Sequence, residues 1–304
     1  MNSPIPLTVI GGYLGTGKTT LINHLLHHAN GVRLAILVND FGDLPIDATL
    51  IESEDGNIIN LSGGCVCCSY GNDLQAALIE LNNSDAAPQQ IVIEASGVAL
   101  PGAIGSAVTL LRHLTLHGVI TLVDAATVRE HAKDKYLGDT IERQLTDADL
   151  VVVNKADLVS TAQLQDTIRW ITTQNPSTKI ATCQYAQVAT GLILDNMPAG
   201  DTRAHPHAST HTVHFESIAL EVPALLVPQQ VAELLAVQQP QVLRAKGFVQ
   251  DPSGTLKTIQ VVGRRWAVSD APPQARAGIV CIGLTDSLCT TALNRALTDL
   301  VAGS

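Results

Sequence analysis

Short apolar runs alternate with amphipathic stretches along the first part of the chain. The runs that read as buried strands, several of them rich in β-branched residues, are residues 7–10, 34–39, 57–61, 90–94, 119–124 and 149–153. Between them, stretches such as residues 20–26 carry apolar side chains at helical spacing. Strands that alternate with helices predict an α/β fold with a mostly parallel sheet covered on both faces.

The last third of the chain has a different pattern, typical of a small α+β domain. Strands are predicted at 213–222, 258–262 and 278–283, and helices at 225–237 and 287–301. Residues 196–212 hold Pro198, Gly200 and Pro206 and have the composition of a linker. We therefore expect a first α/β domain over 1–187, a histidine-containing linker over 188–212 and a smaller α+β domain over 213–304.

A glycine-rich turn lies between the first strand and the first helix. Residues 12–19 read Gly-Tyr-Leu-Gly-Thr-Gly-Lys-Thr and fit G-x-x-x-x-G-K-[ST], the phosphate-binding loop of P-loop NTPases. Its N–H groups would point at phosphates at the positive end of the helix. The residues assigned to the nucleotide here are Gly12, Gly15, Thr16, Gly17, Lys18, Thr19 and Thr20. A chance match is the alternative, and the flanking strand and helix argue against it.

Two acidic side chains lie at strand ends, where open α/β sheets bind their ligands. Asp40 follows the run 34–39, and Glu94 ends the run 90–94 with Gly97 three residues later. A carboxylate-x-x-Gly element after a phosphate-binding loop is typical of switches that sense Mg²⁺ and the γ-phosphate. We assign Lys18, Thr19, Glu94 and Gly97 to hydrolysis, and Thr19, Asp40 and Glu94 to Mg²⁺. A solvated acidic loop is the alternative around Asp40.

The run 149–153 ends in Asn154-Lys155-Ala156-Asp157, the N-K-x-D pattern of guanine recognition. The Asp157 carboxylate would accept hydrogen bonds from the guanine N1–H and 2-amino group, which adenine does not offer in that arrangement. Asn154 and Lys155 would support the base and the loop. In chain order after the other two motifs, this tetrapeptide predicts GTP and GDP as ligands in place of ATP.

Three of the six cysteines lie within four residues, at Cys65, Cys67 and Cys68. Clustered thiolates favour Zn²⁺, Cu⁺ or related borderline ions. Three ligands leave a four-coordinate shell incomplete, which suits a metal that is handed on. A redox pair formed by Cys67 and Cys68 is the main alternative.

Histidines are dense in the linker, at His205, His207, His211 and His214. Neutral imidazoles at this spacing can bind Zn²⁺, Ni²⁺ or Co²⁺, and a polar linker without a metal is an equal alternative. Two other histidine pairs lie four residues apart on expected helices, where packed or solvated side chains are the favoured interpretation: His24 with His28, and His113 with His117.

Composition and charge exclude some partners. The 304 residues carry a net charge of −10, with 46% hydrophobic and 15% charged residues, as in globular proteins. From Val188 onward nine acidic face eight basic residues, so nine of the ten net negative charges precede Val188, which argues against a nucleic acid partner. No apolar run approaches the ~18–20 residues of a membrane span. The chain begins Met-Asn-Ser-Pro, without a signal-type segment, so we expect a cytoplasmic location.

The motifs in this order resemble the CobW family of metallochaperone GTPases, over essentially the full length. The resemblance extends to Pro101 and to the segments 244–247 and 281–283. It implies slow GTP hydrolysis coupled to delivery of Zn²⁺, Co²⁺ or a similar ion to a client metalloprotein. It also implies that the three clustered thiols bind metal close to the switch regions. The family usually has Glu where this chain has Asp40, one methylene shorter, which leaves the metal role of Asp40 open.

The leading hypothesis is therefore a GTP-gated metal carrier, in which GTP and Mg²⁺ order the loops around Asp40 and Gly97 and tighten the thiolate site. One alternative is a maturation factor that docks on a single metalloenzyme, with metal binding incidental. Another is a redox-sensing GTPase. Assembly as a homodimer is left open.

Overall fold

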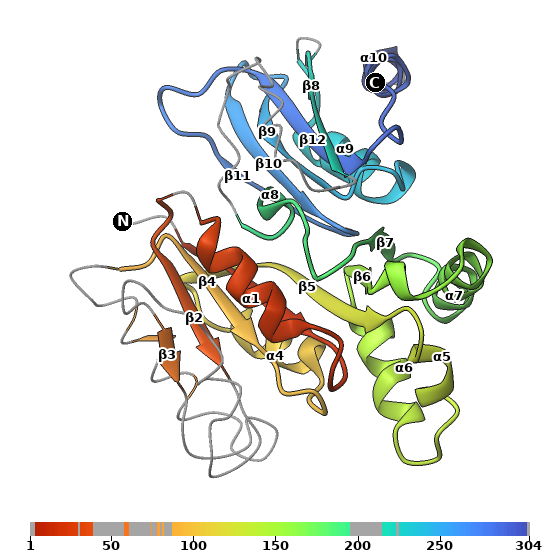
Figure 1. The fold of residues 1–304 in the computed structure, drawn as a ribbon. Coiled ribbons are helices and arrows are strands. Elements are labelled where there is room, and N and C mark those ends of the chain that lie inside the picture. Colours follow the sequence, from red (N-terminus) through yellow and green to blue (C-terminus); the bar gives the residue numbers. More distant parts are fainter. Residues whose placement is uncertain are drawn as a thin grey trace. The chain divides into compact units, whose positions relative to one another are not determined.

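Figure 1 presents a computed structural model of the chain. It describes residues 4–29, 31–38, 58–60, 74, 78–79, 81, 87–194, 215–222 and 225–302. The chain divides into two compact units, the first made of 1–190 with 194–196 and the second of 191–193 with 197–304. Among the described residues, no helix has the length and apolar character needed to cross a membrane.

A seven-stranded sheet organises the first unit. Its strands, in spatial order, are β3 (Ile58–Asn60), β2 (Leu34–Val38), β4 (Gln90–Glu94), β1 (Ile5–Gly11), β5 (Leu114–Asp124), β6 (Leu150–Asn154) and β7 (Lys179–Thr182). Every neighbouring pair is parallel. The predicted parallel α/β sheet is thus confirmed.

Helices cover the sheet because its central strands are apolar on both faces. Leu7 and Val9 of β1 pack in one core cluster with Ile104, while Ile10, which points to the opposite face, is also fully buried. The helices of this unit are α1 (Lys18–His27), α4 (Pro101–Val108), α5 (Val128–His131), α6 (Gly138–Asp147), the 3₁₀ turn η1 (Ala156–Leu158) and α7 (Thr161–Gln174). Helix α8 (Thr190–Ile193) spans the division, with Thr190 in the first unit and Gly191–Ile193 in the second. In Figure 1, α1 lies in red across one face of the sheet.

The helix expected around His113 and His117 is wrong. His113 precedes β5, and His117 lies within it. β5 pairs with β1 from Leu114 to Thr121, but Leu7 is opposite Leu116 while Thr8 is opposite Gly118, so His117 is the extra residue of a β-bulge. The alternation of residues 114–117 favours this strand over a helix.

The second unit is an antiparallel sheet with helices. Its strands, in spatial order, are β11 (Arg265–Asp270), β10 (Leu256–Val262), β9 (Arg244–Gln250), β12 (Gly278–Leu284) and β8 (Phe215–Leu220). Its helices are α9 (Pro228–Glu233), the π-helical turn η2 (Leu234–Gln238) and α10 (Thr290–Ala302). The predicted α+β domain is confirmed, although the helix expected over 225–237 begins three residues later, at Pro228, and ends in a π-helical turn.

Candidate nucleotide-binding site

The site is built on the carboxyl ends of neighbouring parallel strands. The register places Glu94 at the end of β4 level with Ile10 of β1, just before the glycine loop. It places Asn154 at the end of β6 level with Asp124 of β5. Motifs far apart in the sequence therefore meet at one edge of the sheet, where ligands of this fold class bind.

The loop from Gly12 to Gly17 has the backbone of a phosphate-binding loop. Three glycines, Gly12, Gly15 and Gly17, have positive φ angles of 133°, 74° and 103°. At Gly17 a Cβ atom would also lie 2.5 Å from Asn154 Nδ2, so both the φ angle and the close approach require glycine. Helix α1 begins directly afterwards at Lys18, which leaves the N–H groups of its first turn available to an anion.

Lys18 and Thr16 stabilise this loop from within. The Lys18 side chain is almost fully buried, and its Nζ donates to Gly12 O at 2.9 Å and to Tyr13 O at 3.3 Å. The Thr16 hydroxyl donates to the same Tyr13 carbonyl at 2.8 Å. The ammonium group thus lies inside the loop, where phosphate oxygens could replace carbonyl oxygens as its acceptors.

The oxygen donors predicted for Mg²⁺ lie together. The Thr19 hydroxyl donates to Glu94 Oε1 at 3.4 Å, and Glu94 is 2% exposed. Mg²⁺ prefers hard oxygen ligands such as a hydroxyl and a carboxylate, so this pair fits the ion. Thr20, which the sequence assigns to the nucleotide, is the next residue of α1, and its side chain is exposed. Asp40 lies outside the described residues.

The segment after Glu94 packs against the glycine loop. A Cβ atom at Gly97 would lie 2.6 Å from Leu14 Cδ2 and 2.9 Å from Leu14 N, so the two backbones approach closely there. Two carbonyls of this segment, Gly97 O and Ala99 O, accept hydrogen bonds from Gln144 Nε2 at 3.1 and 2.8 Å. The predicted switch segment is therefore held between the glycine loop and α6.

Asn154 ties the guanine motif to the glycine loop. Its Nδ2 donates to Thr16 O at 2.8 Å, and its Oδ1 accepts from Ala186 N at 2.8 Å. The side chain is 2% exposed. Asn154 thus fixes three loops relative to one another, in agreement with the supporting role expected of it.

Lys155 and Asp157 lie on the turn that follows β6. Lys155 has a φ angle of 59°, and its Nζ forms an ion pair with Asp124 Oδ2 at 2.7 Å. Asp157 lies in η1 with an exposed side chain. The carboxylate is therefore open to a ligand, while the lysine is anchored to the end of β5.

Cys183 closes the inner side of this region. Its Sγ lies 3.4 Å from Asn154 Oδ1, and its carbonyl accepts from Ala156 N at 3.1 Å. Burial raises the pKa of the Cys183 thiol to about 12. The thiol stays neutral at physiological pH, so Cys183 is a packing residue of the loop and not a reactive thiolate.

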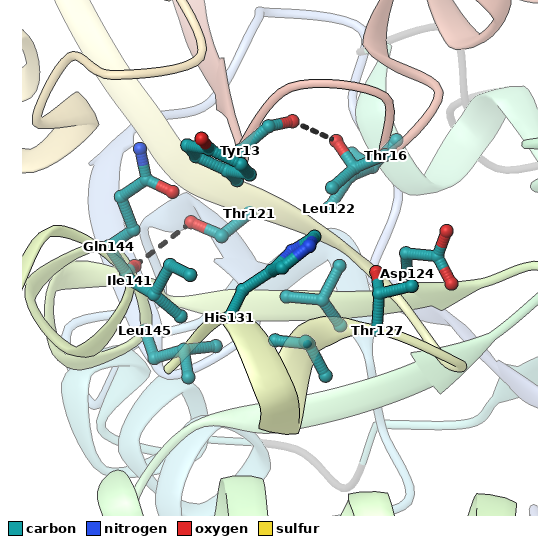
Figure 2. A pocket seen from close by; sticks show the side chains of 12 residues that line it. Tyr13, Thr16, Thr121, Leu122, Asp124, Thr127, His131, Ile141, Gln144 and Leu145 are labelled. Carbon is teal, nitrogen blue, oxygen red and sulfur yellow. Dashed lines mark hydrogen bonds between the residues drawn. The ribbon is translucent and has the colours of Figure 1, made fainter. Parts of the chain in front are cut away.

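A small pocket lies behind the glycine loop, between it, the end of β5 and helices α5 and α6 (Figure 2). Its volume is about 270 Å³, open mouth included. The rings of Tyr13 and His131 meet edge-on across it, with centroids 5.4 Å apart. Gln144 lines the same pocket, and its backbone carbonyl accepts from the Thr121 hydroxyl at 3.1 Å.

The predicted transition-metal ligands Cys65, Cys67, Cys68, His205, His207 and His211 lie outside the described residues. Within the part of the chain that the structure describes, no group of three or more His, Cys, Asp or Glu side chains is arranged to hold a metal ion.

Two residues that shape the site were missed in the sequence. Asp124 carried a signal, since it is an acid that directly ends a buried apolar run. Gln144 carried none, because it belongs to no motif and lies 47 residues from Gly97 in the sequence.

A glycine loop, an acid-x-x-Gly segment and an N-K-x-D turn at one edge of a parallel sheet define the class of P-loop GTPases. Residues 6–182 match the family model described as "CobW/HypB/UreG, nucleotide-binding domain". Residues 215–301 match "Cobalamin synthesis protein cobW C-terminal domain". The chain belongs to the CobW/HypB/UreG family, and the resemblance drawn from its motifs is confirmed.

Relatives named zinc chaperone CobW are similar over most of their length. The one from Sinorhizobium is 29% identical and aligns over 98% of this chain and 97% of its own. The one from Pseudomonas aeruginosa is 30% identical over 86% and 81%. The crystal structure of Zn(II)-bound YjiA GTPase from E. coli covers 99% of both chains at 23% identity with a TM-score of 0.50, which shows a shared fold.

Proposed function

We propose that this chain is a GTP-hydrolysing metallochaperone that binds a transition metal, zinc in the first place, and delivers it to a client protein under nucleotide control. The observation that carries the proposal is the convergence of three GTPase motifs, with Thr19 Oγ1 3.4 Å from Glu94 Oε1 and Asn154 Nδ2 2.8 Å from Thr16 O. The names of the CobW relatives, zinc chaperones, support the metal.

In this proposal each part of the site has one task. The N–H groups of the glycine loop and the Lys18 ammonium hold the β- and γ-phosphates. Thr19 and Glu94 would hold Mg²⁺, which would supply positive charge beside the phosphates. The segment containing Gly97 contacts the γ-phosphate, and Asp157 accepts from the guanine edge.

Guanine recognition is tested by Asp157→Asn. The unaltered chain is expected to hydrolyse GTP and to ignore ATP. An amide at position 157 donates where the carboxylate accepts, so it fits the 2-oxo group of xanthine better than the 2-amino group of guanine. We expect the variant to prefer XTP to GTP by a factor on the order of 100, since a mismatched hydrogen bond to the base costs about 1–3 kcal/mol. Unchanged GTP preference would remove Asp157 from base recognition.

Metal carriage is tested by measuring Zn²⁺ and Co²⁺ affinity against a chromophoric chelator, with GDP and with a non-hydrolysable GTP analogue. We expect tighter binding with the analogue, and loss of that difference in Cys67→Ser. A thousandfold change in metal affinity requires only ~4 kcal/mol between the two states. By linkage, metal must tighten GTP binding relative to GDP binding by the same factor. Equal metal affinities in both nucleotide states would contradict the proposed coupling.

A second candidate is a maturation factor that docks on one metalloenzyme, with metal incidental. The name of a relative from Schizosaccharomyces pombe, "Zinc-regulated GTPase metalloprotein activator 1", favours it; that protein is 31% identical over 61% of this chain and 47% of its own length. Docking on an apo-enzyme that survives in Cys67→Ser and without zinc would favour this reading over the carrier.

The remaining expectations from the sequence stay proposals. They are the role of Asp40 toward Mg²⁺, metal binding by His205, His207 and His211, a domain boundary within 188–212, a cytoplasmic location and assembly as a homodimer.

A further inference from the structure

We infer that Gln144 is the positioning residue that holds the Gly97 segment in the conformation that hydrolyses GTP. The inference rests on the proposed function, because it presumes that this segment contacts the γ-phosphate. It concerns a side chain that belongs to none of the three motifs and that lies on helix α6.

The contacts of Gln144 are those of a clamp. Its side-chain Nε2 reaches Gly97 O at 3.1 Å and Ala99 O at 2.8 Å, so it holds the carbonyls on both sides of Val98. The backbone carbonyl of Gln144 accepts from the Thr121 hydroxyl of β5 at 3.1 Å, so α6 is bonded to β5 at this same residue. The clamp is therefore itself fastened to the central sheet.

The two hydrogen bonds of Gln144 lie on the buried side of the Gly97 segment. Gln144 is 2% exposed, while Val98 between the two bonded carbonyls is 42% exposed. Water is excluded from the bonded side of the segment but not from its outer side. A buried carbonyl that loses its donor is left unsatisfied, so the segment has a strong preference for this position on that side.

The opposite side of Gly97 touches the glycine loop at Leu14. Gly97 is thus positioned by two groups, the backbone of the phosphate-binding loop and the amide of Gln144. Figure 2 shows Gln144 and Tyr13 of the glycine loop beside the same pocket. Loss of the amide should release the segment without disturbing the glycine loop itself.

Gln144→Met tests the inference, because methionine keeps the length and flexibility of glutamine but donates no hydrogen bond. We expect kcat for GTP to fall about tenfold, the value of a lost pair of hydrogen bonds. GDP affinity should stay within about twofold, since GDP lacks the γ-phosphate. The control is Gln163→Met, which removes a glutamine that bonds Ser160 at the start of α7 and should leave kcat unchanged.

Gln144→Glu is a second, independent test for the case that methionine destabilises the protein. A protonated carboxyl group donates one hydrogen bond, whereas the ionised form donates none and faces two carbonyl oxygens. Burial raises the pKa of such a group, so kcat of this variant should fall as pH rises, relative to the unaltered chain. A purely structural role would not produce this pH profile.

The outcomes separate the two proposals. Absence of GTP hydrolysis in the unaltered chain overturns the proposed function and this inference with it. GTP hydrolysis that is unaffected by Gln144→Met and pH-independent in Gln144→Glu overturns this inference alone. A parallel tenfold loss of GDP affinity would also overturn it, because Gln144 would then support the whole site.

Discussion

Several side chains at the site act by holding loops together. Asn154 joins the glycine loop to the turn at Ala186, and Gln144 joins the Gly97 segment to α6. Both are 2% exposed, so their hydrogen bonds are shielded from water and their loss leaves buried groups unsatisfied. Loop position at this sheet edge therefore depends on single amides.

Gly97→Ala should reduce GTP hydrolysis on the order of 100-fold while GDP still binds. The added Cβ would meet Leu14 Cδ2 at 2.6 Å and Leu14 N at 2.9 Å. The exposed leucine side chain can turn away, but the backbone nitrogen belongs to the glycine loop, so the Gly97 segment must move. A displacement of about 1 Å at reacting groups costs about two powers of ten in rate. Single-turnover GTP hydrolysis and GDP titration measure the two quantities.

A matched double variant shows where the strain comes from. Leu14→Ala combined with Gly97→Ala removes the side-chain part of the clash and leaves the contact with the backbone nitrogen. We expect only partial recovery of the hydrolysis rate. Full recovery would mean that Leu14 Cδ2 and Cγ alone set the position of the segment, and an undiminished rate in the single variant would contradict the close approach.

For single residues of the site, the sequence predicted those that belong to known motifs. The glycines and Lys18 could be placed because their spacing reflects a fixed backbone shape, and Glu94 because it ends a strand. Gln144 could not, since a tertiary contact between distant segments leaves no local pattern. The ion pair of Lys155 with Asp124 was missed for the same reason, although Asp124 ends β5 and Lys155 directly follows the neighbouring strand β6.

Among elements, the central parallel strands were predictable because they are short and apolar throughout. The sequence was wrong at 113–117, where two histidines four apart suggested a helix and the bulge at His117 disguised a strand. A bulge inserts one residue, so the alternation of inward and outward side chains shifts by one position and the period-two pattern of the strand is interrupted. The C-terminal strand β11 was also missed; it carries a half-exposed, mostly polar pattern that is weak by periodicity alone.

Helix α1 is fastened to the segment after β7 by a histidine. His24 Nε2 lies 2.8 Å from Val188 O, and burial lowers the pKa of His24, with smaller effects in the same direction from His28 and His27. In the unfolded chain His24 takes up a proton near the ordinary pKa of 6.5, whereas in the folded chain it does so only at lower pH. The free energy of unfolding should fall as pH falls through this value toward the lower folded pKa.

His24→Gln checks this assignment. The glutamine amide can donate to the same carbonyl but binds no proton in this range. Urea unfolding at intervals from pH 8 to pH 5 should show that the unaltered chain loses stability relative to the variant as pH falls. Parallel curves would mean that His24 has the same pKa folded and unfolded. The variant His27→Gln, at an exposed position of the same helix, should keep most of this pH dependence, because His27 has the smallest effect on the pKa of His24.

Over the whole molecule, each of the two units contains hydrophobic core clusters of its own. One group of buried residues includes Leu7, Ile91 and Ile104 of the first unit, and another includes Val231, Ile259 and Leu297 of the second. Their matches to two separate family models agree with this division. Since each unit has its own core, each has the means to fold alone.

A chain that ends at residue 196 should therefore fold and bind GDP with an affinity within a few-fold of the full chain. All residues assigned above to the nucleotide lie within the first unit. This shortened chain keeps Cys65, Cys67 and Cys68 but lacks His205, His207 and His211. If the thiols carry the metal, GTP-dependent Zn²⁺ binding should persist in it and disappear with Cys67→Ser. If GDP binds normally but GTP-dependent zinc binding is lost, the metal belongs to residues beyond 196. Loss of GDP binding itself would show that the first unit requires the second.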